Sequence, residues 1–230
     1  MANDYFKFRQ FTVRQESCAM KVGTDGTLLG VWARGGDSML DIGTGTGLIA
    51  LMLAQRCPAA MITGIDIDHA AVLQANSNVA DSPFADRIHI IEADVQSFSH
   101  AAFDTIVCNP PYFVDSLESP DTQRTLARHA SSLTYRELMA AVARLLADDG
   151  ELSVVIPFDC KTRLEDEAAL AGLFKVRECA VKTTPRKPAR RYLLAFRKHP
   201  QPLELSEGII ETTPGERSSW YQQLTKDFYL

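Results

Sequence analysis

The sequence lacks any long apolar run. None of its uninterrupted hydrophobic stretches approaches the ~20 residues that a membrane-spanning helix requires. The first ten residues, MANDYFKFRQ, carry an acid and alternating aromatic side chains, whereas a secretory signal would have a basic start followed by an apolar block. We therefore expect no association with a membrane and a cytoplasmic location.

Cysteine is scarce and poorly placed for cross-links or metals. The five cysteines are odd in number and far apart, and no two of them form a C-x-x-C pair. This spacing suits neither a disulfide framework nor a zinc site, so we expect reduced thiols and no bound metal. The cysteines are Cys18, Cys57, Cys108, Cys160 and Cys179.

The chain also lacks an excess of positive charge. Its formal net charge of -5 argues against a protein that coats nucleic acids without specificity. The charge is nevertheless uneven, because residues 174–199 contain nine lysines and arginines and one acid, Glu178. We therefore expect a local basic face on an acidic protein. The nine basic residues are Lys175, Arg177, Lys182, Arg186, Lys187, Arg190, Arg191, Arg197 and Lys198.

Length and composition fit one folded domain. A hydrophobic content of 46% and a charged content of 23% are ordinary for a globular protein of 230 residues. We expect a single domain over residues 1–230, with an N-terminal extension (1–37), a core (38–199) and a C-terminal arm (200–230). Nothing in the sequence points to an obligate protein partner.

Strand-like and helix-like patterns alternate through the core. Short apolar runs bounded by turn residues predict strands, and apolar residues at helical spacing between them predict helices. This order predicts an α/β, Rossmann-like fold, with a mostly parallel seven-stranded sheet and helices on both faces. The last two runs are joined too briefly for a parallel crossover and should form an antiparallel hairpin at one edge. The expected strands are residues 38–43, 60–67, 87–94, 103–109, 151–157, 175–183 and 191–198; the expected helices are residues 46–57, 68–80, 134–150 and 161–174.

The two ends of the chain carry weaker patterns. Apolar side chains at every second position predict a half-buried strand over residues 5–15, and a short helix is expected over residues 24–33. The last thirty residues, with Pro202 and Pro214, predict an extended arm and a closing helix that begins near Ser218.

The glycine-rich stretch DIGTGTG, residues 41–47, separates the first core strand from the first core helix. Glycines at alternate positions let the backbone turn tightly and approach a ligand closely. The spacing differs from the G-x-G-x-x-G of dinucleotide enzymes, and Asp41 precedes it. An acid at this place would repel a phosphate and attract an ammonium group, such as the one on the methionine end of S-adenosylmethionine.

Two more acids end the next two strands. Asp66 follows Gly47 by 19 residues, where a carboxylate can accept both hydroxyls of a ribose, and Asp94 could reach an adenine edge. Each acid alone is better explained as a solvated strand end or a helix cap. Three acids at successive strand ends, with the glycine turn between them, favour a nucleoside-binding site.

The stretch NPPYF, residues 109–113, ends the fourth strand. The side-chain oxygen of Asn109 and the carbonyl of Pro110 can accept the two hydrogens of an NH2 group, and the prolines hold that carbonyl in place. Tyr112 can stack on a flat ring. We therefore expect Asn109, Pro110, Pro111 and Tyr112 to be the catalytic residues of an amino-methylating site.

The three motifs DIGTGTG, GIDID and NPPYF occur in the order that resembles class I S-adenosylmethionine-dependent methyltransferases acting on amino groups. The segments MKVGTDGTLLGVWA and LTKDFYL resemble the bacterial tRNA1(Val) adenine-N6 methyltransferase family more specifically. The resemblance spans essentially the whole chain. It implies the class I methyltransferase fold, S-adenosylmethionine as cofactor, tRNA as partner and adenosine 37, beside the anticodon, as the methylated nucleotide.

The resemblance also implies roles for individual residues. Cofactor contacts are implied at Asp41, Gly43, Gly45, Gly47, Asp66, Asp94 and Asn109, and a target-base pocket at Asn109, Pro110, Pro111 and Tyr112. Lys21, Thr24 and Asp25 precede the first core strand; they would close the methionine end of the cofactor site, or simply form a capped loop. Candidate contacts to the RNA backbone are Arg124, Arg128, Arg186, Lys187, Arg190 and Arg191.

Two other functions remain open from the sequence. A protein glutamine amide also offers an NH2 group, but enzymes of that kind usually carry an additional N-terminal domain, and only 37 residues precede the core here. The second alternative is a non-catalytic RNA-binding module on a methyltransferase scaffold.

Overall fold

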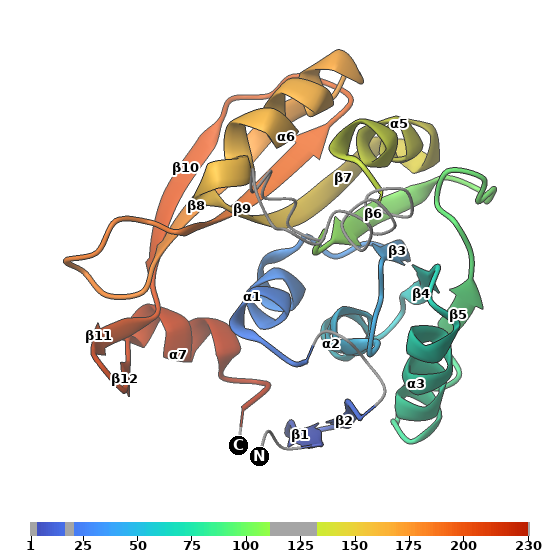
Figure 1. Ribbon diagram of the computed structural model, residues 1–230, viewed down its shortest axis with the longest axis horizontal. Helices are drawn as coiled ribbons and strands as arrows, with labels where there is room; N and C mark the ends of the chain where they lie inside the picture. Colours follow the sequence, from blue (N-terminus) through green and yellow to red (C-terminus); the bar gives the residue numbers. More distant parts are fainter. Residues whose placement is uncertain (1–3, 17–20, 111–132, 230) are drawn as a thin grey trace, which may run out of the picture.

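An eight-stranded sheet forms the centre of the computed structural model, which describes residues 4–16, 21–110 and 133–229 (Figure 1). Five neighbouring strands are parallel, and they alternate with helices because a parallel connection must cross over a face of the sheet. The parallel strands are β3 (Ser38–Ile42), β4 (Met61–Asp66), β5 (Ile88–Glu92), β6 (Phe103–Cys108) and β7 (Leu146–Pro157). The strand order is β10-β8-β9-β7-β6-β3-β4-β5.

Helices cover both faces of this sheet (Figure 1). On one face, α1 (Thr24–Trp32), α2 (Leu48–Arg56) and α3 (His69–Ala80) enclose one buried apolar cluster. On the other face, α5 (Tyr135–Leu145) and α6 (Phe158–Leu170) enclose a second one. The predicted fold class, a mostly parallel sheet between two helical layers, is confirmed. In the part of the chain that the structure describes, no helix has the length and apolarity needed to cross a membrane.

The antiparallel hairpin is formed by β8 (Phe174–Lys182) and β9 (Arg191–Arg197), but it is not the last element of the sheet. An eighth strand, β10 (Glu204–Ile209), pairs in parallel with β8 and lies outside it. The first four residues of β10 are exposed, so its sequence lacks the apolar alternation from which the other strands were expected. Hydrogen bonds between the backbones of β10 and β8, rather than burial of apolar side chains, hold this strand in the sheet.

The helix expected over residues 134–150 is shorter than its sequence indicates. It ends at Leu145, and β7 begins at Leu146, which pairs with Phe103. The next paired residues are Thr105 and Glu151, so the strand bulges between the two pairs. Leu145 and Leu146 are both buried, because the chain changes direction inside the second apolar cluster.

The N-terminal pattern is divided between two short strands rather than one. The strands β1 (Tyr5–Lys7) and β2 (Thr12–Arg14) are antiparallel and are joined by a turn in which the Phe8 amide donates to the carbonyl of Phe11 at 2.9 Å. The Phe8 ring stacks on Tyr229 with centroids 5.8 Å apart, so the two ends of the described chain pack together (Figure 1). The remaining elements are β11 (Glu211–Thr213), β12 (Glu216–Arg217) and α7 (Ser219–Thr225).

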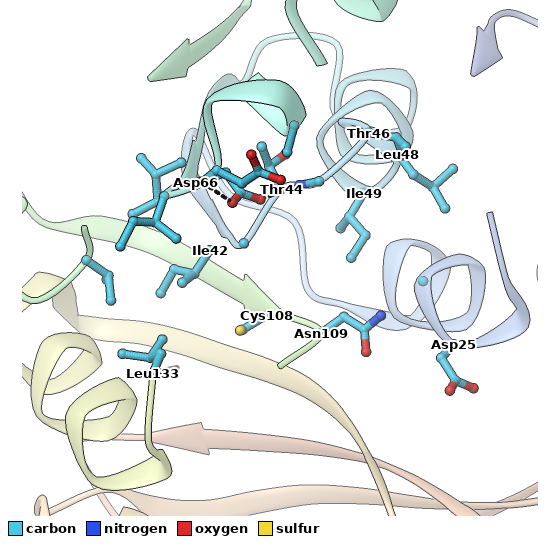
Figure 2. A pocket seen from close by; sticks show the side chains of 18 of the residues that line it. Asp25, Ile42, Thr44, Thr46, Leu48, Ile49, Asp66, Cys108, Asn109 and Leu133 are labelled. Atoms are coloured by element: carbon cyan, nitrogen blue, oxygen red, sulfur yellow. Dashed lines mark hydrogen bonds between the residues drawn. The ribbon is translucent and has the colours of Figure 1, made fainter. Parts of the chain in front are cut away.

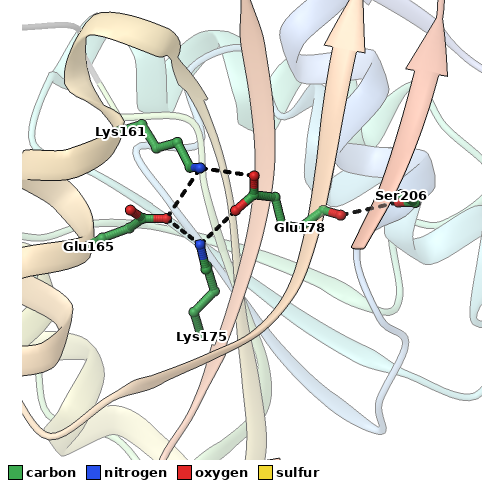
Figure 3. Close-up of polar contacts among 5 residues, drawn as sticks. All are labelled: Lys161, Glu165, Lys175, Glu178 and Ser206. Carbon is green, nitrogen blue, oxygen red and sulfur yellow. Dashed lines mark hydrogen bonds and ion pairs between the residues drawn. The ribbon is translucent and has the colours of Figure 1, made fainter. Parts of the chain in front are cut away.

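Acidic residues from other elements neutralise much of the basic segment 174–199. Figure 3 shows Lys175 between Glu165 of α6 and Glu178 of its own strand, with 2.6 Å to each carboxylate. Lys161 of α6 donates to the other oxygen of Glu178 at 2.9 Å. Five of the nine basic residues are held in such ion pairs: Lys175, Arg177, Lys182, Arg191 and Arg197.

Glu151 is the most buried acid of these ion pairs, and its removal should destabilise the fold. Its side chain is 2% exposed and accepts from Arg177 at 2.6 Å and from Arg197 at 3.0 Å. We expect Glu151→Gln to lower the free energy of unfolding in urea by about 2–4 kcal/mol, because two partly buried guanidinium groups lose their counter-charge. Glu207→Gln is the control: Glu207 is 62% exposed, and its pair with Lys182 should contribute less than about 1 kcal/mol. Equal effects of the two substitutions would contradict this account.

Candidate active site

A cavity of about 790 Å³ lies at the carboxyl ends of β3, β4, β5 and β6. This is the edge at which open α/β sheets bind ligands, because connections leave the adjacent strands β3 and β6 in opposite directions. Figure 2 shows how the side chains surround it, with Asp66 on one side, Asn109 at the end of β6 and Asp25 on α1. The wall combines the loops after these four strands with the N-terminal part of α1 and the start of α5.

The glycine turn after β3 forms one wall. The amides of Gly43 and Thr44 both donate to the carbonyl of Ile65, at 2.9 and 3.0 Å, and so bind the turn to β4. Gly43, Gly45 and Gly47 have φ angles of 70°, 56° and 78°, a left-handed conformation that side-chain-bearing residues rarely adopt. Gly43 and Gly45 line the cavity, whereas Gly47 is the N-cap of α2 and does not.

Asp41 occupies a different position from the one expected. Its side chain is fully buried beneath the glycine turn, where it accepts from the Thr44 hydroxyl at 2.7 Å, and it is not part of the cavity wall. Burial raises the pKa of this carboxyl to about 7. Near neutral pH the group is therefore only partly charged, and direct attraction of a ligand ammonium is not its role in this geometry. The sequence could not show this burial, because an acid near the end of a strand is usually exposed.

Asp66 and Asp94 lie where the sequence predicts. Each oxygen of the Asp66 carboxylate accepts one backbone amide, from Gly45 at 2.9 Å and from Asp68 at 3.0 Å, which leaves lone pairs for ligand hydroxyls. Asp94 accepts from the amide of Gln96 at 2.9 Å, and both residues line the cavity. Ile67, the residue after Asp66, also lines the cavity and is 64% exposed, which gives an apolar surface for a flat ring.

Asn109 follows the last residue of β6 and lines the cavity next to Cys108 (Figure 2). Cys108 is buried, and burial raises the pKa of its thiol, so it is a poor nucleophile. Pro110, the next residue, is buried and is not part of the cavity wall, so the structure does not place it in the expected target-base pocket. The remaining expected residues of this motif, Pro111 and Tyr112, lie outside the described residues, as do Arg124 and Arg128.

The other end of the cavity contains the three residues expected to close it. Lys21, Thr24 and Asp25 all line the wall, and Asp25 forms an ion pair with Arg191, the first residue of β9. Arg191 therefore lies on the cavity wall rather than on the exposed turn, and its expected contact to the RNA backbone stays a prediction. Sequence spacing could not reveal this pair, since its members are 166 positions apart.

The other basic residues of the hairpin are exposed. Arg186, Lys187 and Arg190 lie on the turn between β8 and β9, residues 183–190, which we call the basic turn. Within the described ranges, these three side chains form no ion pair, and none of them reaches the cavity. The basic turn projects from the left side of the molecule in Figure 1. The sequence therefore located an exposed basic segment, but this segment contains three of the nine basic residues counted between positions 174 and 199.

The structure adds residues that the sequence analysis missed. Thr134 and Glu137 form a capping box at the start of α5 and line the cavity. The amide and hydroxyl of Thr134 donate to Glu137 and hold the pKa of its carboxyl below its usual range. The pattern T-x-x-E before an apolar run is a sequence signature of a helix start, so the local structure could have been predicted. The position of this capping box beside the cavity could not have been predicted, because it depends on how the whole chain folds.

The cavity suits an adenine nucleoside joined to an amino acid. Two carboxylates at strand ends can accept hydroxyl and amino hydrogens, an exposed isoleucine can cover a ring, and Asp25 and Lys21 provide opposite charges at the far end. These groups match the ribose, the adenine and the methionine part of S-adenosylmethionine. Among the described residues, no group of His, Cys, Asp and Glu side chains is arranged to hold a metal ion.

The strand order, the glycine turn after β3, the acid at the end of β4 and the amide at the end of β6 define a class I methyltransferase. The model of the methyltransferase small domain family matches residues 27–185. Solved structures with the same fold include a predicted O-methyltransferase of Agrobacterium tumefaciens, with a TM-score of 0.68 and 18% identity over 89% of this chain and 96% of that one. The glycopeptide N-methyltransferase MtfA, solved with S-adenosylmethionine, has a TM-score of 0.56 and 12% identity over 78% of this chain and 100% of its own.

Curated relatives identify the family more closely. The tRNA1(Val) (adenine(37)-N6)-methyltransferase of Bacteroides thetaiotaomicron is 47% identical, over 100% of this chain and 99% of its own length. The protein of the same name from Histophilus somni is 40% identical over 98% of this chain and 97% of its own. The chain belongs to the tRNA1(Val) (adenine(37)-N6)-methyltransferase family.

The buried carboxyl of Asp41 should make stability depend on pH. Folding raises its pKa from 3.8 to about 7, so the folded state keeps a proton that the unfolded chain releases. Its contribution to stability therefore falls as the pH rises from about 4 to about 7, by up to roughly 1.4 kcal/mol per pH unit. The Asp41→Asn side chain cannot ionise, so the free energy of unfolding of this variant should lack the pH-dependent contribution of Asp41. Urea unfolding at pH 4.5 and pH 7 should show the wild type losing about 2–3 kcal/mol relative to Asp41→Asn, and an identical pH dependence of the two would disprove the shift.

Proposed function

We propose that this protein transfers a methyl group from S-adenosylmethionine to N6 of adenosine 37 in tRNA1(Val). The observation that carries the proposal is the similarity over the full length to methyltransferases of that name, at up to 47% identity. The position of Asn109 at the end of β6, on the wall of a nucleoside-sized cavity, supports it chemically. We further propose that residues 1–230 act as one domain in the cytoplasm without an obligate protein partner.

The cofactor would occupy the cavity between the glycine turn and α1. Asp66 would accept the ribose hydroxyls, Asp94 would face the adenine edge, and Ile67 would cover the ring. The side-chain-free face of the glycine turn would lie against the central part of the cofactor, and Lys21, Thr24 and Asp25 would surround its amino-acid end. Gly47 and Asp41 would act indirectly, by starting α2 and by holding Thr44.

Bound S-adenosylmethionine supplies an electrophilic methyl group on a sulfonium. Asn109 would accept one N6 hydrogen. The carbonyl of Pro110 does not line the cavity in this geometry, so it would accept the other hydrogen only after a local rearrangement. Two acceptors favour the pyramidal nitrogen and aim its lone pair at that methyl. Methyl transfer would leave the C–S bonding electrons on the sulfur, and the nitrogen, cationic once bonded to the methyl carbon, would lose a proton to water. No strong base is needed, and the rate enhancement comes mainly from positioning and electrostatic complementarity. Pro111 and Tyr112 would complete the pocket that receives the extruded base.

The basic turn would hold the tRNA backbone. Arg186, Lys187 and Arg190 are exposed, carry no ion pair within the described residues and lie at the cavity side of the sheet, so phosphates can neutralise them without breaking an internal contact. We propose Arg124 and Arg128 as further contacts on the strength of the sequence pattern alone.

Methyl transfer in vitro tests the proposed function. Labelled S-adenosylmethionine is incubated with the protein and an unmodified tRNA1(Val) transcript, and in parallel with a transcript that carries guanosine at position 37. We expect label in N6-methyladenosine with the first transcript and none with the second. Label in a protein, or equal labelling of both transcripts, would refute the proposal.

Asn109→Ala tests the assigned acceptor. We expect kcat to fall by about 10²–10³-fold, the usual loss for one preorganised polar contact to the reacting group, with cofactor affinity changed by only a few-fold. Asn76→Ala, at an exposed position of α3, is the matched control and should keep wild-type kcat. The assignment fails if Asn109→Ala retains wild-type turnover.

Replacing Arg186, Lys187 and Arg190 together by glutamine tests the RNA contact. We expect weaker tRNA binding and a salt dependence whose slope, log Kd against log salt, is smaller by about 2–3, since up to three phosphate contacts are lost. Cofactor binding should not change. A triple glutamine variant of the exposed Lys7, Arg34 and Lys226 changes the net charge equally and controls for it. If both triple variants shift the slope alike, the basic turn is not the contact.

A further inference from the structure

Phe158 lies at the edge of the sheet that carries the cavity, and the site described so far gives it no role. Phe158 is the first residue of α6, directly after β7, and it is 55% exposed. A single exposed apolar residue is ordinary on a protein surface. Three features distinguish Phe158: its position, its neighbours and the rigidity of its support.

The position follows from the strand register. Val154 of β7 pairs with Cys108 of β6, so Pro157 extends about 10 Å beyond that pair toward the edge that carries Asn109. Pro157 pairs with Arg191, which lines the cavity. Phe158 therefore lies at the same edge of the sheet as the cavity, beside the strand that follows the basic turn.

The neighbours of Phe158 are aromatic and cationic. Its ring lies 6.2 Å from that of Tyr192, centroid to centroid, and the ammonium of Lys161 lies 4.6 Å from the Tyr192 centroid. The Phe158 amide donates to the carbonyl of Arg190, the last residue of the basic turn, at 3.1 Å. Phe158 is thus an exposed ring with an aromatic partner, and its backbone is hydrogen-bonded to a cationic turn. Aromatic rings combined with cationic groups bind single-stranded nucleic acid.

The support is rigid. Lys161 joins the first turn of α6 to Glu178 of β8, and Lys175 joins the same glutamate to Glu165 one turn further along α6 (Figure 3). These partly buried ion pairs fix the start of α6 against the hairpin. Because the backbone that carries the Phe158 ring is fixed, a base that stacks on the ring needs to order little of the chain.

We propose that Phe158 stacks on a nucleotide that flanks the target adenosine in the anticodon loop. The inference rests on the proposed function. Extruding adenosine 37 removes the stacking surface of its neighbours, and the Phe158 ring replaces it while Arg190, Arg186 and Lys187 hold the adjoining phosphates. Phe158 is a positioning residue for the RNA and does not touch the reacting atoms.

Three variants test this role. We expect Phe158→Ala to raise KM for tRNA1(Val) by about 5- to 150-fold, the loss that one base–aromatic stack gives, with kcat for saturating tRNA and cofactor affinity near wild type. Phe158→Tyr should restore wild-type KM. Phe174→Ala is the control, because Phe174 is 45% exposed and begins β8 at the opposite edge of the sheet.

A second measurement identifies the stacked base. Anticodon-loop substrates with an abasic nucleotide at position 36 or position 38 are compared for the wild type and Phe158→Ala. One abasic substrate should bind both proteins equally, because the stack is already lost. Equal KM for Phe158→Ala and Phe174→Ala, or an undiminished effect of Phe158→Ala on both abasic substrates, would overturn the inference. A wild type that does not methylate tRNA would instead refute the proposed function.

Discussion

The hydrogen bonds that join the glycine turn to the end of β4 set the geometry of the whole cavity. The carbonyl of Ile65 accepts the amides of Gly43 and Thr44, and the Asp66 carboxylate accepts that of Gly45. The turn can follow this path only with positive φ angles, which explains the glycines. Asp66 consequently fixes the turn, and its remaining lone pairs are the ones that the proposed function gives to ribose hydroxyls. All of these contacts are made between protein groups, so the shape of the turn does not depend on a ligand.

The same edge also connects the cavity to the proposed RNA surface. Arg191 pairs with Asp25 of α1, and the next residue, Tyr192, contacts Phe158. The residue before it, Arg190, ends the basic turn. The three consecutive residues 190–192 thus join three parts of the molecule. They link the basic turn, the end of the cavity proposed for methionine, and the aromatic pair of Tyr192 and Phe158. Ion pairs neutralise five of the nine basic side chains of residues 174–199, and three of the remaining four form the exposed basic turn.

The sequence predicted the fold class because its apolar runs alternate at lengths that fit a parallel sheet with crossover helices. It also placed Asp66, Asp94 and Asn109 correctly on the cavity wall, since the carboxyl ends of parallel strands share one edge. It could not predict β10, whose pairing relies on backbone groups, or the burial of Asp41, which depends on packing. Pairs such as Arg191 with Asp25 join distant segments and leave no trace in local composition.

The central claim is methylation of adenosine 37, and the most direct test is mass spectrometry of nucleosides from purified tRNA1(Val). Cells with a functional copy of the gene are compared with cells from which it has been deleted and with deleted cells that carry the Asn109→Ala variant. The account predicts N6-methyladenosine at position 37 only in the first of these. The same modification in all three, or its absence from all three, would contradict the account.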